Sequence, residues 1–238
     1  MKLNINFNSF KKNHKLKKNQ LIYFVKKCRD YRKIENLFNF LLINKNSFIF
    51  ESVEKGIKKG RYTIIGLNPD KIWDINKNTI VEKIDGKRKI IKKKPLDFLN
   101  KTIHNFHNKI PKNIPAMASM LVGYFSYNVI KYIEDIPDRN KDDLKIPDVR
   151  LSRPRNLIIY DNSKKKIFYI ENIYSDTKIS NYYEEYQSII NNFKTFQDFE
   201  NIKLPFKFNY KKNINKIKSN ISKNIFKNNV KRAKKYIA

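Results

Sequence analysis

Pairs of short apolar segments joined by turn residues constrain the fold of this chain most strongly. Residues 79–84 and 89–92 flank Asp85-Gly86, a dipeptide that favours a two-residue hairpin turn. Residues 157–160 and 167–170 likewise flank a turn sequence, DNSKKK, and their apolar residues follow the alternation of a strand. Hairpins join antiparallel strands, and no regular strand–helix alternation is present to build a parallel sheet. The sequence therefore predicts an α+β fold of mostly antiparallel sheet layers with a few packed helices.

Further elements are predicted around these hairpins. Helices are expected where apolar residues recur every three or four positions: after Asp30 as a candidate N-cap, from Pro95, over 176–193 and over 222–238. Expected strands cover 21–25, 47–52, 61–67, 71–76 and 117–127, the last with a helical continuation. A charged loop punctuated by prolines is expected over 136–154.

Polar stretches with little periodicity divide the chain. Residues 1–20 are rich in Asn and Lys and are predicted to form a basic flexible arm. Residues 21–195 carry most of the predicted elements and form the main domain. Residues 196–218 turn polar again and are expected to be a linker, so that 219–238 stand apart with the last helix.

The charge balance is extreme, with 52 Lys and Arg against 22 Asp and Glu and a net charge of +30. The lysines are spread along the chain and form no single patch, which argues against specific nucleic-acid recognition. That class of protein stays open as an alternative, to be tested by a salt titration of binding. No run of about 18 apolar residues predicts a membrane span. With a single cysteine and a polar start, we expect a cytoplasmic protein.

Motifs for catalysis or metal binding are not evident in the sequence. His104 and His107 share a predicted helix, but no further ligand pair accompanies them. No glycine-rich phosphate loop occurs, and the neighbouring carboxylates fall in charged loops or on helix faces. Residue chemistry alone therefore predicts no catalytic or metal site.

Two segments invite a functional interpretation. A predicted strand ends in the polar sequence Glu51-Ser52-Val53-Glu54, and an Arg-Tyr strand follows. Glu51 could accept a hydrogen bond from an ammonium and Ser52 offers a hydroxyl, which together suit a small zwitterion. An ordinary strand–turn–strand with a polar edge is the alternative. In LVGYFSY, Gly123 marks a close backbone approach or a bulge, unless the segment is plain core.

Five motifs, in order, resemble those of anthranilate synthase component I. They are FIFESVE, GRYTIIGLNP, LVGYFSYNVIKYIEDIP, DDLKIPDVRLSRPRNLIIYDN and SNISKNIFKNNVKRAKKYI. The resemblance runs from about Leu21 to the C-terminus. Departures from the family pattern are small: Thr63 replaces Ser, Asn128 replaces Asp, Lys131 replaces Arg and Tyr160 replaces Phe. The sister family, aminodeoxychorismate synthase component I, shares the architecture.

The resemblance implies part of a lyase of tryptophan biosynthesis. The complete enzyme converts chorismate and ammonia into anthranilate and pyruvate with Mg²⁺, and a glutamine amidotransferase subunit supplies the ammonia. By the same resemblance, 21–195 is an N-terminal regulatory domain, and 219–238 is the first helix of a chorismate-binding catalytic domain. Ser52 and Glu51 then belong to a site where L-tryptophan acts as feedback inhibitor. Catalytic and metal residues would lie in the rest of that domain, so this chain alone is expected to be inactive and to bind no metal. Alternatives are a fragment of the sister enzyme or a non-catalytic ligand-binding remnant.

Overall fold

The structure is a computed structural model that describes residues 3–41, 44–51, 60–106, 108–137, 142–201 and 218–237. The chain divides into two compact units, Met1–Lys203 and Leu204–Ala238. The described part of the second unit carries helix α5 (Lys223–Ile237). The first unit holds the sheet and the remaining described helices. Its strands are β1 (Gln20–Lys27), β2 (Phe48–Glu51), β3 (Tyr62–Asn76), β4 (Thr79–Ile84), β5 (Lys87–Ile91), β6 (Val122–Phe125), β7 (Val149–Asp161) and β8 (Lys166–Ile173). Its helices are α1 (Phe7–Lys15), α2 (Tyr31–Leu41), α3 (Pro95–His104) and α4 (Tyr182–Gln197), with short 3₁₀ turns η1 (Ala116–Ala118), η2 (Tyr127–Tyr132) and η3 (Phe199–Asn201).

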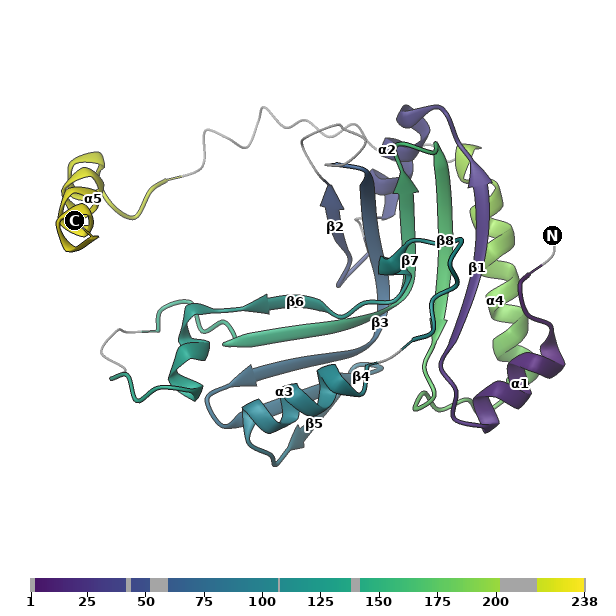
Figure 1. Ribbon diagram of the computed structural model, residues 1–238, viewed down its shortest axis with the longest axis horizontal. Coiled ribbons are helices and arrows are strands. Elements are labelled where there is room, and N and C mark those ends of the chain that lie inside the picture. The colour runs from purple at the N-terminus through teal and green to yellow at the C-terminus, as the bar shows by residue number, and fades with distance from the viewer. Residues whose placement is uncertain are drawn as a thin grey trace. The chain divides into compact units, whose positions relative to one another are not determined.

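A single antiparallel sheet forms the first unit, with strand order β1-β8-β7-β3-β4-β5. In addition, β2 pairs with β3 and β6 pairs with β7. Every strand pair is antiparallel, and helices pack on the sheet (Figure 1). The predicted α+β fold is confirmed, as are both hairpins. In the β4–β5 turn, Asp85 and Gly86 have φ values of 47° and 75°, the left-handed pair that a type I′ turn requires.

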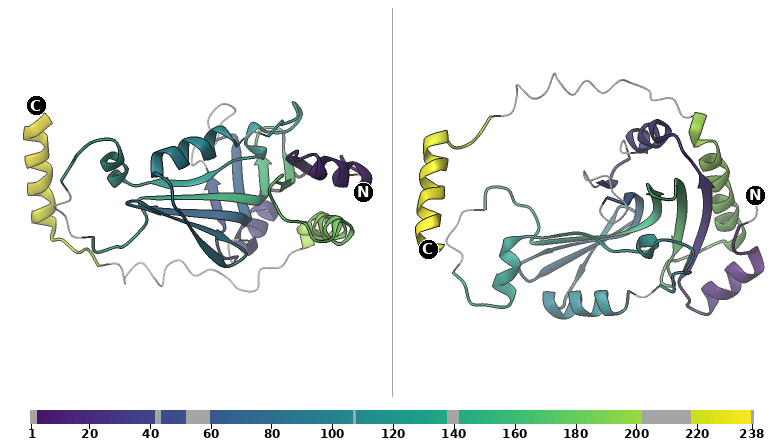
Figure 2. Two further views of the ribbon diagram at one scale, coloured as in Figure 1. Left: turned by 90° about the horizontal axis from the view of Figure 1, so that it is seen from below. Right: turned by 45° about the horizontal axis from the view of Figure 1, so that its top comes forward.

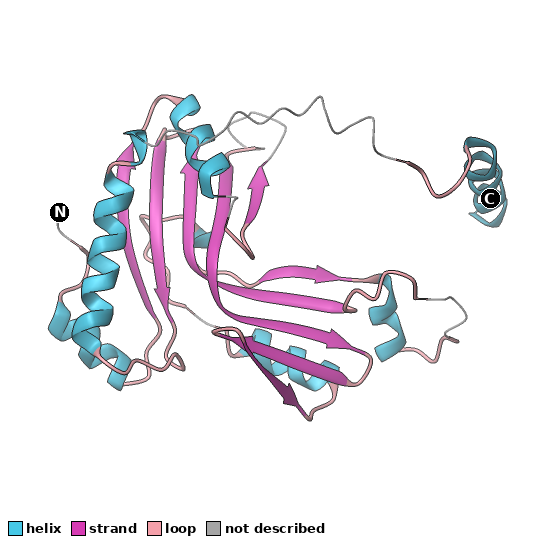
Figure 3. Cartoon of the chain, turned by 180° about the vertical axis from the view of Figure 1, so that it is seen from behind, coloured by secondary structure: helices cyan, strands magenta, loops and turns pink. Residues whose placement is uncertain are grey.

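The two longest strands, β3 and β7, bend sharply and divide the sheet into two halves (Figures 1 and 3). The bend coincides with Pro69 opposite Pro154 and with a register shift between Pro69 and Lys71. Proline offers no N–H to the ladder and is tolerated in strands at such irregularities. On one side of the bend the order is β1-β8-β7-β3-β2, and on the other it is β6-β7-β3-β4-β5.

Alternate residues of the strands on the first side face two different apolar layers. Ile158 and Tyr160 of β7 belong to one cluster, and Leu157 and Ile159 to the other, as the two-residue period of a strand requires. The first layer packs under α1, α2 and α4, and α1 and α4 lie side by side near β1 and β8 (Figure 2). The second packs against the loop that carries Ile114 and Ala118. Because both faces are covered, apolar side chains on both faces of these strands are buried.

Beyond the bend, a third apolar cluster forms between the sheet and α3. Trp73 and Ile75 of β3, Leu151 of β7, and Phe98 and Leu99 of α3 are buried there. Helical spacing from Pro95 predicts that Ile103 faces inward, but this is wrong, because its side chain is 51% exposed at the end of α3. Phe98 lies on the buried face instead, where its ring meets Trp73 edge-on with a centroid distance of 6.2 Å.

The predicted flexible arm over 1–20 is wrong, because most of this segment is structured. Asn6 caps α1 by accepting a hydrogen bond from the backbone N–H of Ser9. Phe10 is fully buried in the cluster under α1 and α4, and Gln20 already begins β1. Buried Phe10 and the hydrogen bond between His14 and Tyr182 hold α1 on the domain. The lysine-rich composition of the segment does not indicate these contacts.

Several predicted boundaries also need correction. The two strands predicted over 61–67 and 71–76 are one, and the strand predicted over 117–127 is reduced to β6 between η1 and η2. Part of the loop predicted over 136–154 belongs to β7. The helix predicted over 176–193 lies at α4, because Asn181 provides the N-cap. The linker cannot begin at 196, since Phe196 and Phe199 are buried; residues 202–217 of the predicted linker lie outside the described ranges. The helix expected from Ser222 is confirmed as α5, with Ser222 Oγ accepting from the N–H of Ile225 at 3.3 Å.

The close approach considered for Gly123 is present. A Cβ added there would overlap the backbone carbonyl oxygen of Arg150 on β7. The neighbouring Tyr124 and Phe125 are 37% and 53% exposed, so the segment is not plain core. Only glycine lets β6 lie this close to β7.

Candidate functional site

Glu51, the residue predicted to accept a ligand ammonium, lies at the end of β2. Its backbone is paired with that of Thr63 on β3, and its side chain is exposed. The Tyr31 hydroxyl, at the start of α2, donates a hydrogen bond to Glu51 Oε1. Burial of the Tyr31 ring and this hydrogen bond raise the pKa of Tyr31 to about 12, so the phenol stays a donor at neutral pH. An anchored carboxylate that still meets solvent can accept a further hydrogen bond from an ammonium.

The Arg-Tyr strand that follows is engaged in structural contacts. Arg61 Nη2 lies 2.7 Å from Asp161 Oδ2, and Arg61 Nε lies 3.1 Å from Asp161 Oδ1, a bidentate pair. Burial opposes ionisation of Asp161, but the hydrogen bond and charge of Arg61 and the backbone N–H groups of Lys164 and Ser163 together outweigh it and lower the pKa of Asp161. The same carboxylate accepts the N–H groups of Ser163 and Lys164 and so closes the β7–β8 turn. Arg61 therefore fixes the end of the hairpin and leaves Glu51 to Tyr31.

Ser52 lies outside the described residues, as does His107. The assignment of Ser52 and Glu51 to an inhibitor site thus stays a prediction. Over the ranges that the structure describes, no group of three or more His, Cys, Asp or Glu side chains could hold a metal ion. No helix within those ranges is long and apolar enough to cross a membrane.

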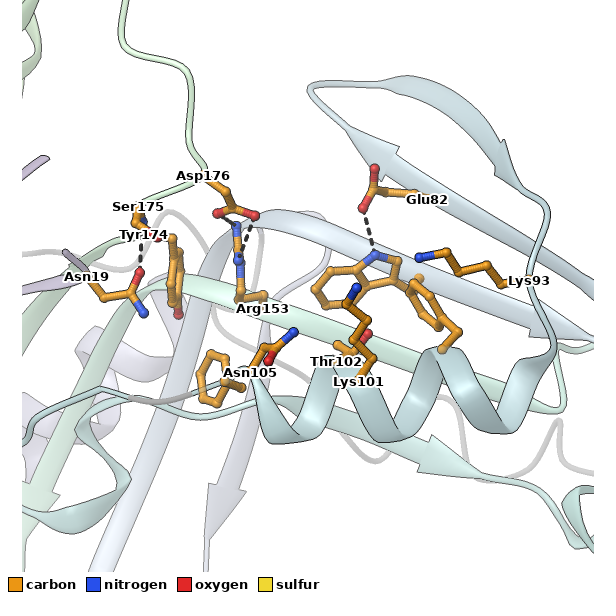
Figure 4. Close-up of a pocket in the computed structure, with 13 residues that line it drawn as sticks. Asn19, Glu82, Lys93, Lys101, Thr102, Asn105, Arg153, Tyr174, Ser175 and Asp176 are labelled. Atoms are coloured by element: carbon orange, nitrogen blue, oxygen red, sulfur yellow. Dashed lines mark hydrogen bonds and ion pairs between the residues drawn. The ribbon is translucent and has the colours of Figure 1, made fainter. Parts of the chain in front are cut away.

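A cavity of about 490 Å³ opens beyond the bend and does not include Glu51 (Figure 4). It lies between α3, strands β3 and β4, and the segment that follows β8. Aromatic rings and polar side chains alternate around it, and Lys93 and Lys101 extend into it from the two ends of the α3 region (Figure 4). The lining consists of Asn19, Trp73, Glu82, Lys93, Phe98, Lys101, Thr102, Asn105, Phe106, Arg153, Tyr174, Ser175 and Asp176.

Arg153 holds the acidic side of this cavity. Its Nε donates to Asp70 at 2.8 Å and its Nη2 to Asp176 at 2.8 Å, while its Cζ lies 4.0 Å from the centroid of the Tyr174 ring. Lys71 Nζ adds a second ion pair to Asp176 at 2.6 Å. Burial opposes ionisation of Asp176, but these cations outweigh it and lower the pKa of Asp176 to about 2. Asp176 is therefore ionised at neutral pH, and both carboxylates are matched by cations.

Sequence reasoning missed the cavity completely. Its lining comes from positions 19 to 176 and forms no motif. The signals that point toward it are the chain's single tryptophan and the arginines on either side of Pro154. Neither is specific enough to predict a site without the bend that brings the segments together.

Comparison with known proteins bears on the whole chain. A sequence model of a protein family described as chorismate binding enzyme matches residues 45–238. The chain belongs to this family. The match covers strands β2 to β8 and helices α3, α4 and α5.

Relatives within the chorismate binding enzyme family agree with the resemblance seen in the motifs. Anthranilate synthase component 1 of Acetivibrio thermocellus is 32% identical over 200 residues, which cover 80% of this chain and 40% of the relative. The protein of the same name from Cereibacter sphaeroides is 27% identical over 173 residues, 68% of this chain and 33% of the relative. The resemblance to anthranilate synthase component I is thereby confirmed. The chain spans 40% or less of the length of these two relatives.

A solved structure also matches. The crystal structure of anthranilate synthase component I from Streptococcus pneumoniae aligns with a TM-score of 0.49 and 20% identity. The alignment covers 70% of this chain and 34% of the other.

Proposed function

We propose that this chain is the N-terminal part of an anthranilate synthase component I. The observation that supports this most directly is the 32% identity to a protein of that name over 80% of the chain. The complete enzyme would act as a cytoplasmic lyase that forms anthranilate and pyruvate from chorismate and ammonia. A glutamine amidotransferase subunit would supply the ammonia, and Mg²⁺ bound elsewhere in the complete enzyme would stabilise charge on the substrate.

Residues 21–195 would serve as the regulatory domain and 219–238 as the first helix of the chorismate-binding domain. Because the family resemblance assigns the chorismate and magnesium ligands to the remainder of that domain, the 238-residue chain alone should form no anthranilate. Chorismate, ammonia and Mg²⁺ are incubated with purified chain, and anthranilate fluorescence is followed against a no-protein control. Formation of anthranilate above that control, in protein free of host enzyme, would contradict the proposal.

We also propose that L-tryptophan inhibits the complete enzyme through Glu51 and Ser52. Glu51 supports this, since its carboxylate is held by Tyr31 and remains exposed at the strand end. The ligand's ammonium would donate to Glu51, and the Ser52 hydroxyl would provide a second polar partner.

The test joins this chain to the remaining part of the Acetivibrio thermocellus relative and compares Ser52→Phe with Ser163→Phe. Ser163 lies exposed in the β7–β8 turn and serves as the matched control. Loss of a hydrogen bond to a charged group and the added ring should weaken tryptophan inhibition by at least about tenfold in Ser52→Phe. Activity without tryptophan should stay unchanged, because the effector site and the chemistry are coupled but separate. Equal inhibition curves for the two variants would remove Ser52 from the site.

Product analysis of the same joined protein separates the main alternatives. Aminodeoxychorismate as product would identify the sister enzyme, aminodeoxychorismate synthase component I. A joined protein that binds tryptophan but gives neither product would favour a non-catalytic ligand-binding remnant.

A further inference from the structure

The cavity beside α3 has the volume of a small-molecule site and walls of buried aromatic side chains. Its volume of about 490 Å³ falls within the usual range of ligand pockets, roughly 300–1,000 Å³. Trp73, Phe98 and Tyr174 at its walls are each at most 9% exposed, so these walls are fixed by packing. The site does not depend on the function proposed above.

Charge on the cavity is unbalanced toward the positive. Glu82 lies 3.9 Å from Lys71 Nζ and accepts the Trp73 Nε1–H at 2.9 Å. Asp176 is matched by Arg153 and Lys71. In the part of the chain that the structure describes, the side-chain ammonium groups of Lys93 and Lys101 form no ion pair or hydrogen bond. Three carboxylates, Asp70, Asp176 and Glu82, share the two cations Arg153 and Lys71. With Lys93 and Lys101 the group carries a net charge of +1, and the two unpaired ammonium groups can receive an anion.

The walls favour a flat ligand. Trp73 and Phe98 meet edge-on at 6.2 Å, and the rings of Phe106 and Tyr174 lie 6.0 Å apart. The Arg153 guanidinium lies between the two groups, 5.9 Å from the Trp73 ring and 4.0 Å from the Tyr174 ring. Aromatic rings pack well against such edges and faces, and a planar guanidinium can stack on a further ring.

We propose that this cavity binds a small aromatic carboxylate, with the ring against Trp73 and the carboxylate on Lys93 and Lys101. A zwitterionic amino acid would bind less well, because its ammonium would meet the same lysines. The ligand class thus differs from the zwitterion expected at Glu51.

Benzoate is the probe, and Trp73 is the reporter, since it is the single tryptophan of the chain. Titration of the full 238-residue chain should give a saturable change in Trp73 fluorescence, in the millimolar range or tighter, and calorimetry should give the same Kd. Cyclohexanecarboxylate should bind at least about fivefold more weakly, because it lacks the flat ring. L-Phenylalanine and benzylammonium should bind more weakly still.

A matched pair of double variants tests the role of the lysines. Lys93→Gln/Lys101→Gln should weaken benzoate binding by at least about tenfold, as expected for loss of charge-assisted hydrogen bonds. Lys92→Gln/Lys94→Gln makes the same change in net charge at exposed neighbours outside the cavity, and its Kd should stay within about twofold. All four lysines are exposed, so circular dichroism and melting temperature should not change. No saturable binding, or an equal loss in both double variants, would overturn the proposal and leave only nonspecific attraction to a basic protein.

Discussion

Replacing Arg153 by methionine should be among the most damaging single changes in the sheet. Only 9% of the Arg153 side chain is exposed, and it makes hydrogen bonds to two carboxylates, Asp70 and Asp176. The Asp70 side chain is itself only 12% exposed. Methionine preserves most of the apolar stem but removes the charge. Asp176 keeps Lys71, whereas among the described residues Asp70 retains only the hydroxyl of Thr177 at 3.2 Å.

The expected loss follows from that unpaired carboxylate. Breaking a buried ion pair by removing one partner costs about 3–5 kcal/mol, since the other charge stays buried. Arg150→Met is the matched control on the same strand. Its side chain is 43% exposed, and its partner Asp74 keeps an ion pair with Lys83. The control should therefore lose less than about 1 kcal/mol.

Urea unfolding followed by circular dichroism measures both variants at neutral pH, and a common m-value licenses the comparison. Adding Asp70→Asn to Arg153→Met should recover part of the loss, because it removes the uncompensated charge. If Arg153→Met loses no more than Arg150→Met, the buried-charge argument is refuted. If Asp70→Asn brings no recovery, Asp70 is not the source of the loss.

Three further outcomes are expected. Gly123→Ala should destabilise the domain by about 1–3 kcal/mol, because the new methyl group would overlap backbone atoms of β7. Gly66→Ala should cost less in thermal melts, because the nearest atoms to its new methyl group belong to the Phe48 ring, which can move. The pKa of Asp176 is lowered to about 2, so its ionised form stabilises the fold at any pH above the pKa of Asp176 in the unfolded chain, and this contribution is lost as the pH falls toward 2. Because the side chain is 48% exposed, an acid titration of unfolding should show a contribution of only about 1 kcal/mol, and Asp176→Asn should lack it. Nucleic-acid affinity should fall about 10³-fold or more between 50 and 200 mM salt, in line with the net charge of +30, and no preference for a particular sequence should remain at the higher salt concentration.

Local signals account for the elements that the sequence predicted well. The Asp85-Gly86 turn and the DNSKKK turn each specify a hairpin from residues adjacent in the chain. Asp30 accepts the N–H of Arg32 at 3.0 Å, as a helix cap should, and Ser222 does the same for α5. The spacing of apolar residues and the turn or cap residues are sufficient to predict an element when the groups that stabilise it lie within a few residues of one another.

Elements whose burial depends on distant segments were not predictable in the same way. Phe10 on α1 is buried by Tyr182 and Tyr186 of α4, about 170 residues later. Within the lysine-rich start of the chain, nothing local reveals that partner. The helix predicted over 176–193 begins too early, because the Asp176 carboxylate binds Arg153 and Lys71 and Asn181 caps α4 instead. The polar strand end and the family motif both point to Glu51, but its partner Tyr31 lies on another element and could not be predicted from either.

The bend at Pro69 and Pro154 explains both why β3 is one strand, where two were predicted, and why a cavity forms beside it. At Pro69 and Pro154 neither strand offers an N–H to the ladder, and the register shift leaves Asp70 as the extra residue between Pro69 and Lys71. That bulged residue meets Arg153, the neighbour of the opposite proline, and the guanidinium also reaches Asp176 beyond β8. The break in pairing thus creates both the ion-pair cluster and one wall of the cavity. Two prolines 85 positions apart signal a strand end when each is considered alone. Their juxtaposition across β3 and β7 turns two strand ends into one continuous bent sheet with a pocket beside the bend.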